Sequence, residues 1–199
     1  MIEDIGRRGF FSESLKALAR TLAETASAGK EFRGKPSFDQ RRRIRPPGAL
    51  EEMAFLQTCL ADECNDCVTA CPVDCIEKVP GGYGDTGTPV IIPALRACTM
   101  CVEVACSKVC EVGALTVVES PDQIDIGVAV LDESTCLAFN GTFCVSCFNI
   151  CPTQPKAIRL DERGRPYVDE DPCTGCGLCE EHCPTTPKAI WVKSDRQGK

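Results

Sequence analysis

The residues best suited to chemistry in this chain are its cysteines, and the clearest group lies near the C-terminus. Cys173, Cys176, Cys179 and Cys183 follow the spacing C-x2-C-x2-C-x3-C, and Pro184 comes next. This run is a ligand pattern for [4Fe-4S] clusters: the first three cysteines lie on one tight loop, and in two-cluster proteins the fourth binds the other cluster. One such motif therefore predicts a partner motif.

The chain contains three further motifs of four cysteines. In chain order they are Cys59, Cys64, Cys67 and Cys71 (motif one); Cys98, Cys101, Cys106 and Cys110 (motif two); and Cys136, Cys144, Cys147 and Cys151 (motif three). The run at Cys173 is motif four. The first cysteines stand at positions 59, 98, 136 and 173, so successive motifs are 39, 38 and 37 residues apart, which indicates an internal repeat. Four complete ligand sets predict four [4Fe-4S] clusters.

Disulfides and zinc are the alternative uses of so many cysteines. A Cys-rich secreted chain is usually a disulfide scaffold, but the count of 17 is odd and the triplet spacing is not typical of such frameworks. Structural zinc sites combine two cysteine pairs separated by a longer spacer. The spacing favours iron–sulfur clusters, and a structural zinc protein is the alternative.

The seventeenth cysteine, Cys75, lies outside all four motifs. The residues that follow the fourth cysteine of a motif are called its exit. Cys75 lies in the exit of motif one, where the exits of the other motifs have Ala114, Ala157 and Ala189. A cysteine in an alanine position behaves as a small buried residue. The alternative is a spare or replacement ligand.

Composition and charge exclude several other functions. The chain has 199 residues and a formal net charge of −7 at pH 7, and clusters with thiolate ligands make it more negative, so nucleic-acid binding is not expected. We recognise no nucleophile–histidine set and no paired carboxylate motif. Because each motif offers four cysteines, no iron is left open to a substrate. We therefore expect no catalytic residues and an electron-transfer role.

The elements that position the cysteines follow the same repeat. A helix is expected over residues 49–60, ahead of motif one, and short helices are expected to end near each fourth cysteine. Strands are expected at residues 90–92, 115–118, 124–131, 158–160, 167–169 and 190–192. A hairpin turn is expected at 162–165. The order of cysteine loop, helix and strand predicts an α+β fold, with two ferredoxin-like two-cluster units forming one domain over residues 49–193 and a polar tail at 194–199.

The N-terminal 48 residues contain no cysteine. Residues 1–28 predict an amphipathic helix that buries Phe11, Leu15, Leu18 and Leu22 on another subunit or a second copy of the chain. The alternative is a degenerate twin-arginine export signal around residues 6–11. Neither has an apolar run long enough to span a membrane.

Residues 29–48 are expected to form a linker rich in Pro and Gly. It carries a basic run made of Arg41, Arg42, Arg43 and Arg45. Such a run is either simply solvated or binds an acidic surface, including that of the cluster domain itself.

From residue 45 to residue 192 the chain resembles the NapG/MauM-type ferredoxins, electron-transfer proteins with four four-iron clusters. The resemblance rests on residues 45–50, the motif at Cys98, the apolar stretch 126–131, the long-spaced motif at Cys136 and the run at Cys173. It implies an electron-transfer subunit that relays electrons between a catalytic oxidoreductase subunit, of molybdenum, tungsten or flavin type, and another redox partner. A membrane-associated, quinol-linked periplasmic ferredoxin and a ferredoxin that assists cofactor maturation are the alternatives.

The resemblance also implies which motifs share clusters. In related four-cluster subunits of molybdenum and tungsten oxidoreductases, motif one exchanges its fourth cysteine with motif four, and motif two with motif three. The implied ligand sets are Cys59, Cys64, Cys67 with Cys183; Cys173, Cys176, Cys179 with Cys71; Cys98, Cys101, Cys106 with Cys151; and Cys136, Cys144, Cys147 with Cys110. The export signal of the periplasmic family members is eroded here, so the expected location is cytoplasmic, with a membrane-associated periplasmic location as the alternative.

Overall fold

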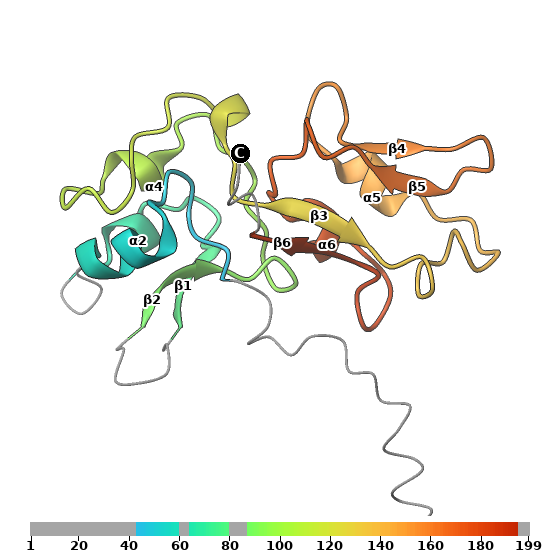
Figure 1. Cartoon of the computed structure of the whole chain (residues 1–199), viewed down its shortest axis with the longest axis horizontal. Coiled ribbons are helices and arrows are strands. Elements are labelled where there is room, and N and C mark those ends of the chain that lie inside the picture. Colours follow the sequence, from blue (N-terminus) through green and yellow to red (C-terminus); the bar gives the residue numbers. More distant parts are fainter. Residues whose placement is uncertain (1–42, 60–63, 80–86, 195–199) are drawn as a thin grey trace, which may run out of the picture. The chain divides into compact units, whose positions relative to one another are not determined.

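The computed structural model describes residues 43–59, 64–79 and 87–194. Its helices are α2 (Glu52–Thr58), α3 (Asp66–Thr69), α4 (Ala105–Lys108), α5 (Ser146–Ile150), α6 (Leu178–Glu181) and the 3-10 helix η2 (Pro121–Gln123), and its strands are β1 (Ile76–Val79), β2 (Thr88–Ile91), β3 (Val128–Leu131), β4 (Ile158–Leu160), β5 (Pro166–Val168) and β6 (Ile190–Lys193) (Figure 1). The predicted helix 1–28, most of the linker and the tail after residue 194 lie outside the described residues. The described elements form a mixed α+β fold.

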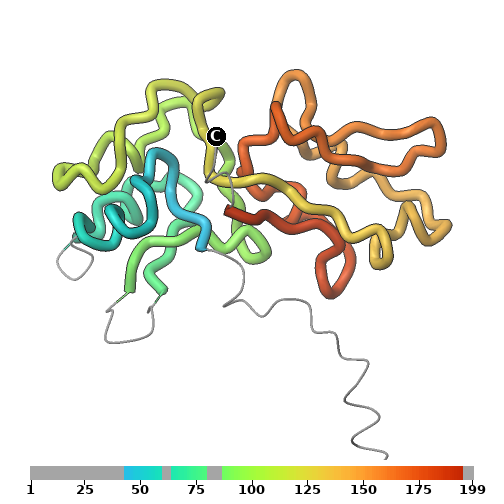
Figure 2. Tube along the Cα trace, viewed as in Figure 1, coloured from blue at the N-terminus to red at the C-terminus, as the bar shows by residue number. Residues whose placement is uncertain are grey.

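The strands form three antiparallel pairs, β1–β2, β3–β6 and β4–β5. In the pair with the longest sequence separation, Val128 lies opposite Lys193 and Leu131 opposite Ile190. Figure 2 shows the yellow segment of β3 and the dark red segment of β6 side by side. This pairing brings the end of the chain back to the segment that leads into motif three.

Most of the expected strands form, but the prediction is wrong in two places. The sequence pattern does not predict β1, and residues 115–118 form no strand. Instead, the Thr116 N–H donates to the Gly48 carbonyl at 2.7 Å, and Leu115 forms an isolated bridge with Ala49. The predicted turn is confirmed: the Asp161 N–H donates to the Arg165 carbonyl at 2.9 Å, between β4 and β5. Each fourth cysteine does follow a short helix, as expected.

Those four helices, α3 to α6, are too short to be stable alone, so their packing holds them in place. α3 contacts α4, and α5 contacts α6. Because each of these helices begins within its motif and ends one or two residues before the fourth cysteine, the packing places motif one against motif two and motif three against motif four.

The core contains few large side chains and many cysteines. Phe55 and Ile158 are among the largest fully buried side chains. Cysteine is the most frequent residue type among the buried apolar side chains, ahead of isoleucine. Much of the interior is therefore bordered by thiols instead of by bulky apolar groups. No helix in the described part of the chain is long and apolar enough to cross a membrane.

Residues 43–48, which the sequence assigns to the linker, pack into the described fold. Ile44 bridges Ile91, and the Arg45 side chain is buried. The Arg45 guanidinium donates to both carboxylate oxygens of Glu52, at 2.9 and 2.6 Å, and lies 4.5 Å from the centre of the Phe55 ring. Of the basic run, Arg45 therefore binds an acidic group of its own domain; Arg41 and Arg42 lie outside the described residues.

Candidate metal centres

The structure gathers the sixteen motif cysteines into four sets, each with three cysteines of one motif and the fourth cysteine of another. Set 1 is Cys59, Cys64, Cys67 and Cys110; set 2 is Cys98, Cys101, Cys106 and Cys71; set 3 is Cys136, Cys144, Cys147 and Cys183; set 4 is Cys173, Cys176, Cys179 and Cys151. The sets are named below by these numbers.

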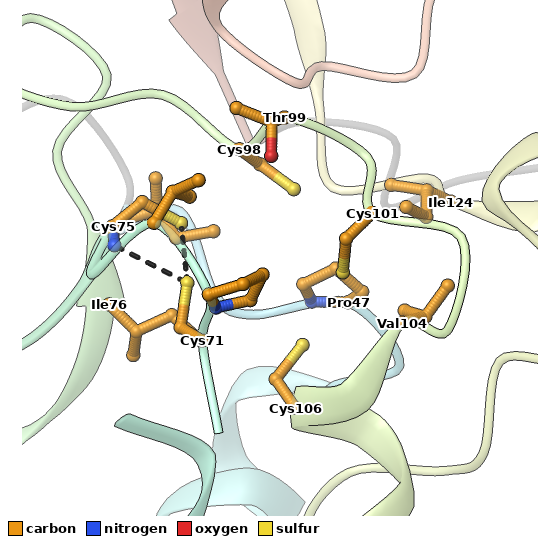
Figure 3. Close-up of a pocket in the computed structure, with 13 residues that line it drawn as sticks. Pro47, Cys71, Cys75, Ile76, Cys98, Thr99, Cys101, Val104, Cys106 and Ile124 are labelled. Atoms are coloured by element: carbon orange, nitrogen blue, oxygen red, sulfur yellow. Dashed lines mark hydrogen bonds between the residues drawn. The ribbon is translucent and has the colours of Figure 1, made fainter. Parts of the chain in front are cut away.

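Set 2 surrounds an apolar cavity. Figure 3 shows the sulfur atoms of Cys71, Cys98, Cys101 and Cys106 directed into the same space. The remaining wall is mostly aliphatic, with Pro47, Ile76, Val104 and Ile124 among its residues. Burial raises the pKa of Cys106 to about 12, and repulsion from Cys98, Cys101 and Cys71 adds to the effect. These neighbours place Cys71 with motif two.

Sets 3 and 4 have the same construction. Cys183 lines one cavity with Cys136, Cys144 and Cys147, and Leu131 and Ile190 complete part of its wall. The cysteines of set 4 line a second cavity together with Ala129, Ile158 and Val192. The walls come from β3 and β6 in both cases, so one strand pair serves two sets.

Set 1 lies closer to the surface. Burial raises the pKa of Cys67 to about 11, and repulsion from Cys59, Cys64 and Cys110 adds to it, so these four sulfurs are neighbours. Phe55, Ala114 and Leu115 form the buried cluster against which Cys59, Cys67 and Cys110 pack. All four cysteines of this set are partly exposed.

This grouping corrects the pairing that the resemblance implied. Motif one exchanges its fourth cysteine with motif two, not with motif four, and motif three exchanges with motif four. Cys71 therefore lies in set 2 instead of beside Cys173, and Cys183 lies in set 3 instead of beside Cys59. The physical reason is the packing of α3 on α4 and of α5 on α6, which brings these motifs face to face.

The residues fit a [4Fe-4S] cluster by the chemistry of their donors. Thiolates are the ligands of such clusters, and each of the four cysteines binds a different iron, so the sulfurs surround a cavity instead of meeting at one point. Within residues 43–59, 64–79 and 87–194, no group of three or more His, Cys, Asp or Glu side chains is arranged to hold a single metal ion. The aliphatic walls keep water away from the sulfurs, which is a setting that tunes cluster potentials.

The fourth cysteines of sets 3 and 4 each have a threonine hydroxyl beside the sulfur. Thr153 Oγ1 lies 3.4 Å from Cys151 Sγ, and Thr185 Oγ1 lies 3.2 Å from Cys183 Sγ. Burial opposes ionisation of Cys151, but the hydroxyl and backbone N–H groups that point at its sulfur outweigh burial and lower its pKa. The pKa of Cys183 is lowered in the same way. These hydrogen bonds stabilise the thiolate that a metal needs.

Motifs three and four end in similar sequences, residues 151–158 and 183–190, which share the pattern C-P-T-x-P-K-A-I. The lysine of each exit donates hydrogen bonds to carbonyl groups at the C-terminal end of the preceding short helix. Lys156 Nζ donates to the carbonyls of Phe148 and Cys151 at 3.0 and 2.8 Å, and Lys188 Nζ donates to those of Glu181 and Cys183 at 2.9 and 2.7 Å. The repeat C-P-T-x-P-K-A-I was the available signal, since it contains both the threonine donor and this lysine.

The four sets are ordered in space as 1, 2, 4 and 3. Cys67 of set 1 packs against the buried cluster that contains the buried cysteines of set 2, and Cys176 of set 4 belongs to that same cluster. The Cys98 N–H of set 2 donates to the Cys176 carbonyl at 3.0 Å. Set 4 then shares its own buried cluster with set 3, through Cys173 and Cys136 among others.

The sets differ in the exposure of their cysteines. All four cysteines of set 4 are buried, sets 2 and 3 each have one partly exposed cysteine, Cys101 and Cys144, and set 1 is partly exposed throughout. Phe143, directly before Cys144, exposes 86% of its surface, and Val102, directly after Cys101, exposes 77%. Sets 1, 2 and 3 therefore each have at least one cysteine that reaches the surface.

Comparison with known proteins supports the assignment of [4Fe-4S] cluster binding. The family model of the 4Fe-4S dicluster domain matches residues 142–186, which span most of motifs three and four. The chain is 37% identical over 188 residues to the ferredoxin-type protein NapG of Escherichia coli (strain K12), covering 86% of this chain and 78% of that protein. It is 39% identical over 185 residues to the methylamine utilization ferredoxin-type protein MauM of Methylorubrum extorquens, covering 86% and 81%. For MauM of Paracoccus denitrificans the identity is 40% over 183 residues, covering 87% and 80%. The resemblance indicated by the motifs is confirmed.

Proposed function

Because the chain belongs to the NapG/MauM family of ferredoxin-type proteins, which bind [4Fe-4S] clusters and transfer electrons, we propose that it is a four-cluster relay subunit. Each cysteine set holds one cluster, and the protein passes single electrons between a catalytic oxidoreductase subunit and a second redox partner. The sixteen cysteines of sets 1 to 4 are the cluster ligands. The chain itself converts no organic substrate.

The observation that carries this proposal is the spatial order of the sets. Sets 2 and 4 meet at the Cys98–Cys176 hydrogen bond, and sets 1 and 3 lie at the two ends. When bound, a [4Fe-4S] cluster supplies a one-electron carrier whose potential depends on its surroundings. Two internal carriers joined to two outer ones make a path with an entrance and an exit.

Residues inside this path and residues at its ends have different roles. The aliphatic walls around set 4 exclude water from all four of its buried cysteines. At the ends, the four partly exposed cysteines of set 1 and Cys144 of set 3, which follows the exposed Phe143, give partners access to the outer sets. Because sets 1 and 3 end the order, we expect exchange with partners there.

The class of partner follows from the potentials expected for the clusters. A negative chain disfavours added electrons, so the potentials lie in the lower part of the protein range of about −700 to +450 mV. Such potentials suit a molybdenum, tungsten or flavin centre as the catalytic partner. Residues 1–28 are proposed to dock on that partner or on a second copy of this chain. A quinol-linked NapG-type role and a role in cofactor maturation are the alternatives.

The compartment is part of the proposal. The eroded export signal predicts a cytoplasmic location, but membership of the NapG/MauM family favours the periplasmic alternative, since periplasmic members are part of that resemblance. Cell fractionation of the untagged protein distinguishes the two: activity of a periplasmic marker in the same fraction supports export, and co-fractionation with a cytoplasmic marker argues against it.

The relay is tested by purifying the protein anaerobically with whatever it binds. The isolated chain should convert no substrate, and its clusters should be reduced rapidly when the catalytic partner receives its own substrate. Substrate conversion by the isolated chain would defeat the proposal. Full activity of the partner towards its natural acceptor after this chain is removed would defeat it too, and would leave the maturation role as the better account.

A further inference from the structure

Cys75 is the one cysteine that belongs to none of the four sets, and it lies against set 2. Its side chain is 3% exposed, and its sulfur is 3.4 Å from the sulfur of Cys71. The backbone N–H of Cys75 donates to the same Cys71 sulfur, also at 3.4 Å. Figure 3 shows Cys75 joined to Cys71 by both contacts; Cys75 lines the same cavity as the four cysteines of set 2.

The chemistry of the pair fixes the direction of the sulfur–sulfur hydrogen bond. A cysteine that binds iron does so as a thiolate and has no proton to donate, so Cys71 accepts. The thiol of Cys75 is then the donor, because S–H is a weak donor and sulfur a weak acceptor. Cys98 also lies beside the Cys75 thiol and belongs to the same set, so a donation to either sulfur acts on set 2. The contact is a directed hydrogen bond once set 2 holds its cluster.

The exits of motifs three and four support this interpretation, whereas that of motif two has Val112 in the threonine position. In sets 3 and 4 the sulfur of the fourth cysteine has a threonine hydroxyl beside it, at 3.2 Å for Thr185 and 3.4 Å for Thr153. The exit of motif one has Pro72 and Val73 after Cys71, without a hydroxyl at the matching place. Cys75 brings a side-chain donor to the fourth cysteine from a different position in the chain.

We propose that Cys75 is a positioning residue that donates a hydrogen bond to Cys71 and thereby raises the reduction potential of the cluster in set 2. It is neither a ligand nor a filler in an alanine position. The proposal rests on the proposed function in one respect, that set 2 holds a cluster. A donor to a ligand sulfur stabilises the reduced cluster more than the oxidised one, because reduction adds negative charge.

The test is an anaerobic redox titration of the full-length, cluster-loaded protein, followed by electron paramagnetic resonance. Cys75→Ala removes the donor and matches the residue at the other exits. It should lower one of the midpoint potentials and leave the others in place. Since S–H is a weak donor, we expect a roughly three- to tenfold fall in the reduction equilibrium constant, and tenfold corresponds to about 59 mV for one electron. Cys75→Ser keeps a donor and should restore the midpoint.

The matched control is Val73→Ala, which changes the aliphatic wall beside Cys71 without removing a side-chain donor; it should shift the set 2 midpoint less than Cys75→Ala does. A Cys75→Ala protein with unchanged midpoints would show that Cys75 is a filler and overturn the proposal. Loss of about a quarter of the iron in that variant would show that Cys75 is a ligand and overturn it as well.

One more measurement separates this proposal from the relay. Cys101→Ala removes the partly exposed ligand of set 2, so it should lower the iron content of the protein if that set is loaded. If Cys101→Ala loses no iron, set 2 is empty, and the four-cluster proposal fails together with this one. If it loses iron but Cys75→Ala has no effect on any midpoint, only the role of Cys75 fails.

Discussion

At the scale of single residues, the fourth cysteine of each motif decides which parts of the chain depend on each other. Cys71 and Cys110 exchange places between motifs one and two, and Cys151 and Cys183 exchange between motifs three and four. Each exchange makes two cysteine sets, and each of these sets links two motifs. Substitution of a fourth cysteine should therefore damage the set that receives it, and not the motif in which it stands.

Cys71→Ser tests this directly. We expect it to impair the cluster held by Cys98, Cys101 and Cys106, because the Cys71 sulfur lies in that cavity. Iron should fall from about sixteen per chain towards about twelve. The altered cluster is identified by comparison with Cys101→Ala, whose spectrum should lack the same signals. Loss of the signals that Cys179→Ala removes would restore the pairing of motif one with motif four and contradict the structure.

At the scale of elements, the loop of motif four lies against residues 126 and 127, directly before β3. Gly175 has φ +72, and a Cβ there would overlap the backbone of Gly127. Ile126, just before it, donates its N–H to the Thr174 carbonyl at 3.0 Å. The backbones approach so closely that only glycine fits at position 175, whereas a Cβ on Gly127 would overlap the Lys193 carbonyl oxygen.

Gly175→Ala should therefore destabilise the protein by more than the cost of placing alanine in a left-handed conformation. The matched control is Gly141→Ala, since Gly141 has φ +81 but a Cβ added to it would meet no atom within 4 Å. The control should cost about 1–2 kcal/mol from its left-handed conformation, and Gly175→Ala should cost several kcal/mol because backbone must also move. Denaturant midpoints of the cluster-loaded proteins measure the difference. Equal denaturant midpoints for the two variants would contradict a close backbone contact between Gly175 and Gly127.

The elements also separate what the sequence predicted from what it missed. The repeat predicted the short helix before each fourth cysteine and the strands after residue 157, because each lies within one motif and its exit. It did not predict which motifs pair, since that depends on contacts such as β3 with β6, whose residues are about sixty positions apart. Residues 115–118 look like a strand, but they pack beside residues 48–49, where only an isolated bridge forms.

At the scale of the whole molecule, the clusters replace a conventional core. Cysteines make up a large part of two of the three buried groups of side chains and pack against the third, and the cavities of sets 2, 3 and 4 are bordered by thiols. A protein built in this way takes much of its folding free energy from metal binding. The candidate ligands could be predicted from their spacing because the same cysteines bind the clusters and stabilise the fold.

Removal of the clusters should consequently unfold residues 50–193. We expect the apoprotein, made by anaerobic chelation, to lose its cooperative unfolding transition and most of its amide hydrogen-exchange protection. Reconstitution with iron and sulfide should recover both. An apoprotein that kept a native-like cooperative transition would show that side-chain packing alone stabilises the fold, and that the clusters contribute little to its stability.

The central claim is a single path through sets 1, 2, 4 and 3, and interrupting its middle tests that claim most directly. The measurement is rapid-freeze electron paramagnetic resonance of the protein in complex with its catalytic partner, after the partner receives substrate, with Cys101→Ala compared to the unsubstituted chain. A single path predicts that the outer cluster next to the partner is reduced at the normal rate and that the outer cluster at the far end is reduced much more slowly. Reduction of both outer clusters at the normal rate, in a variant that has lost the set 2 cluster, would contradict a single path.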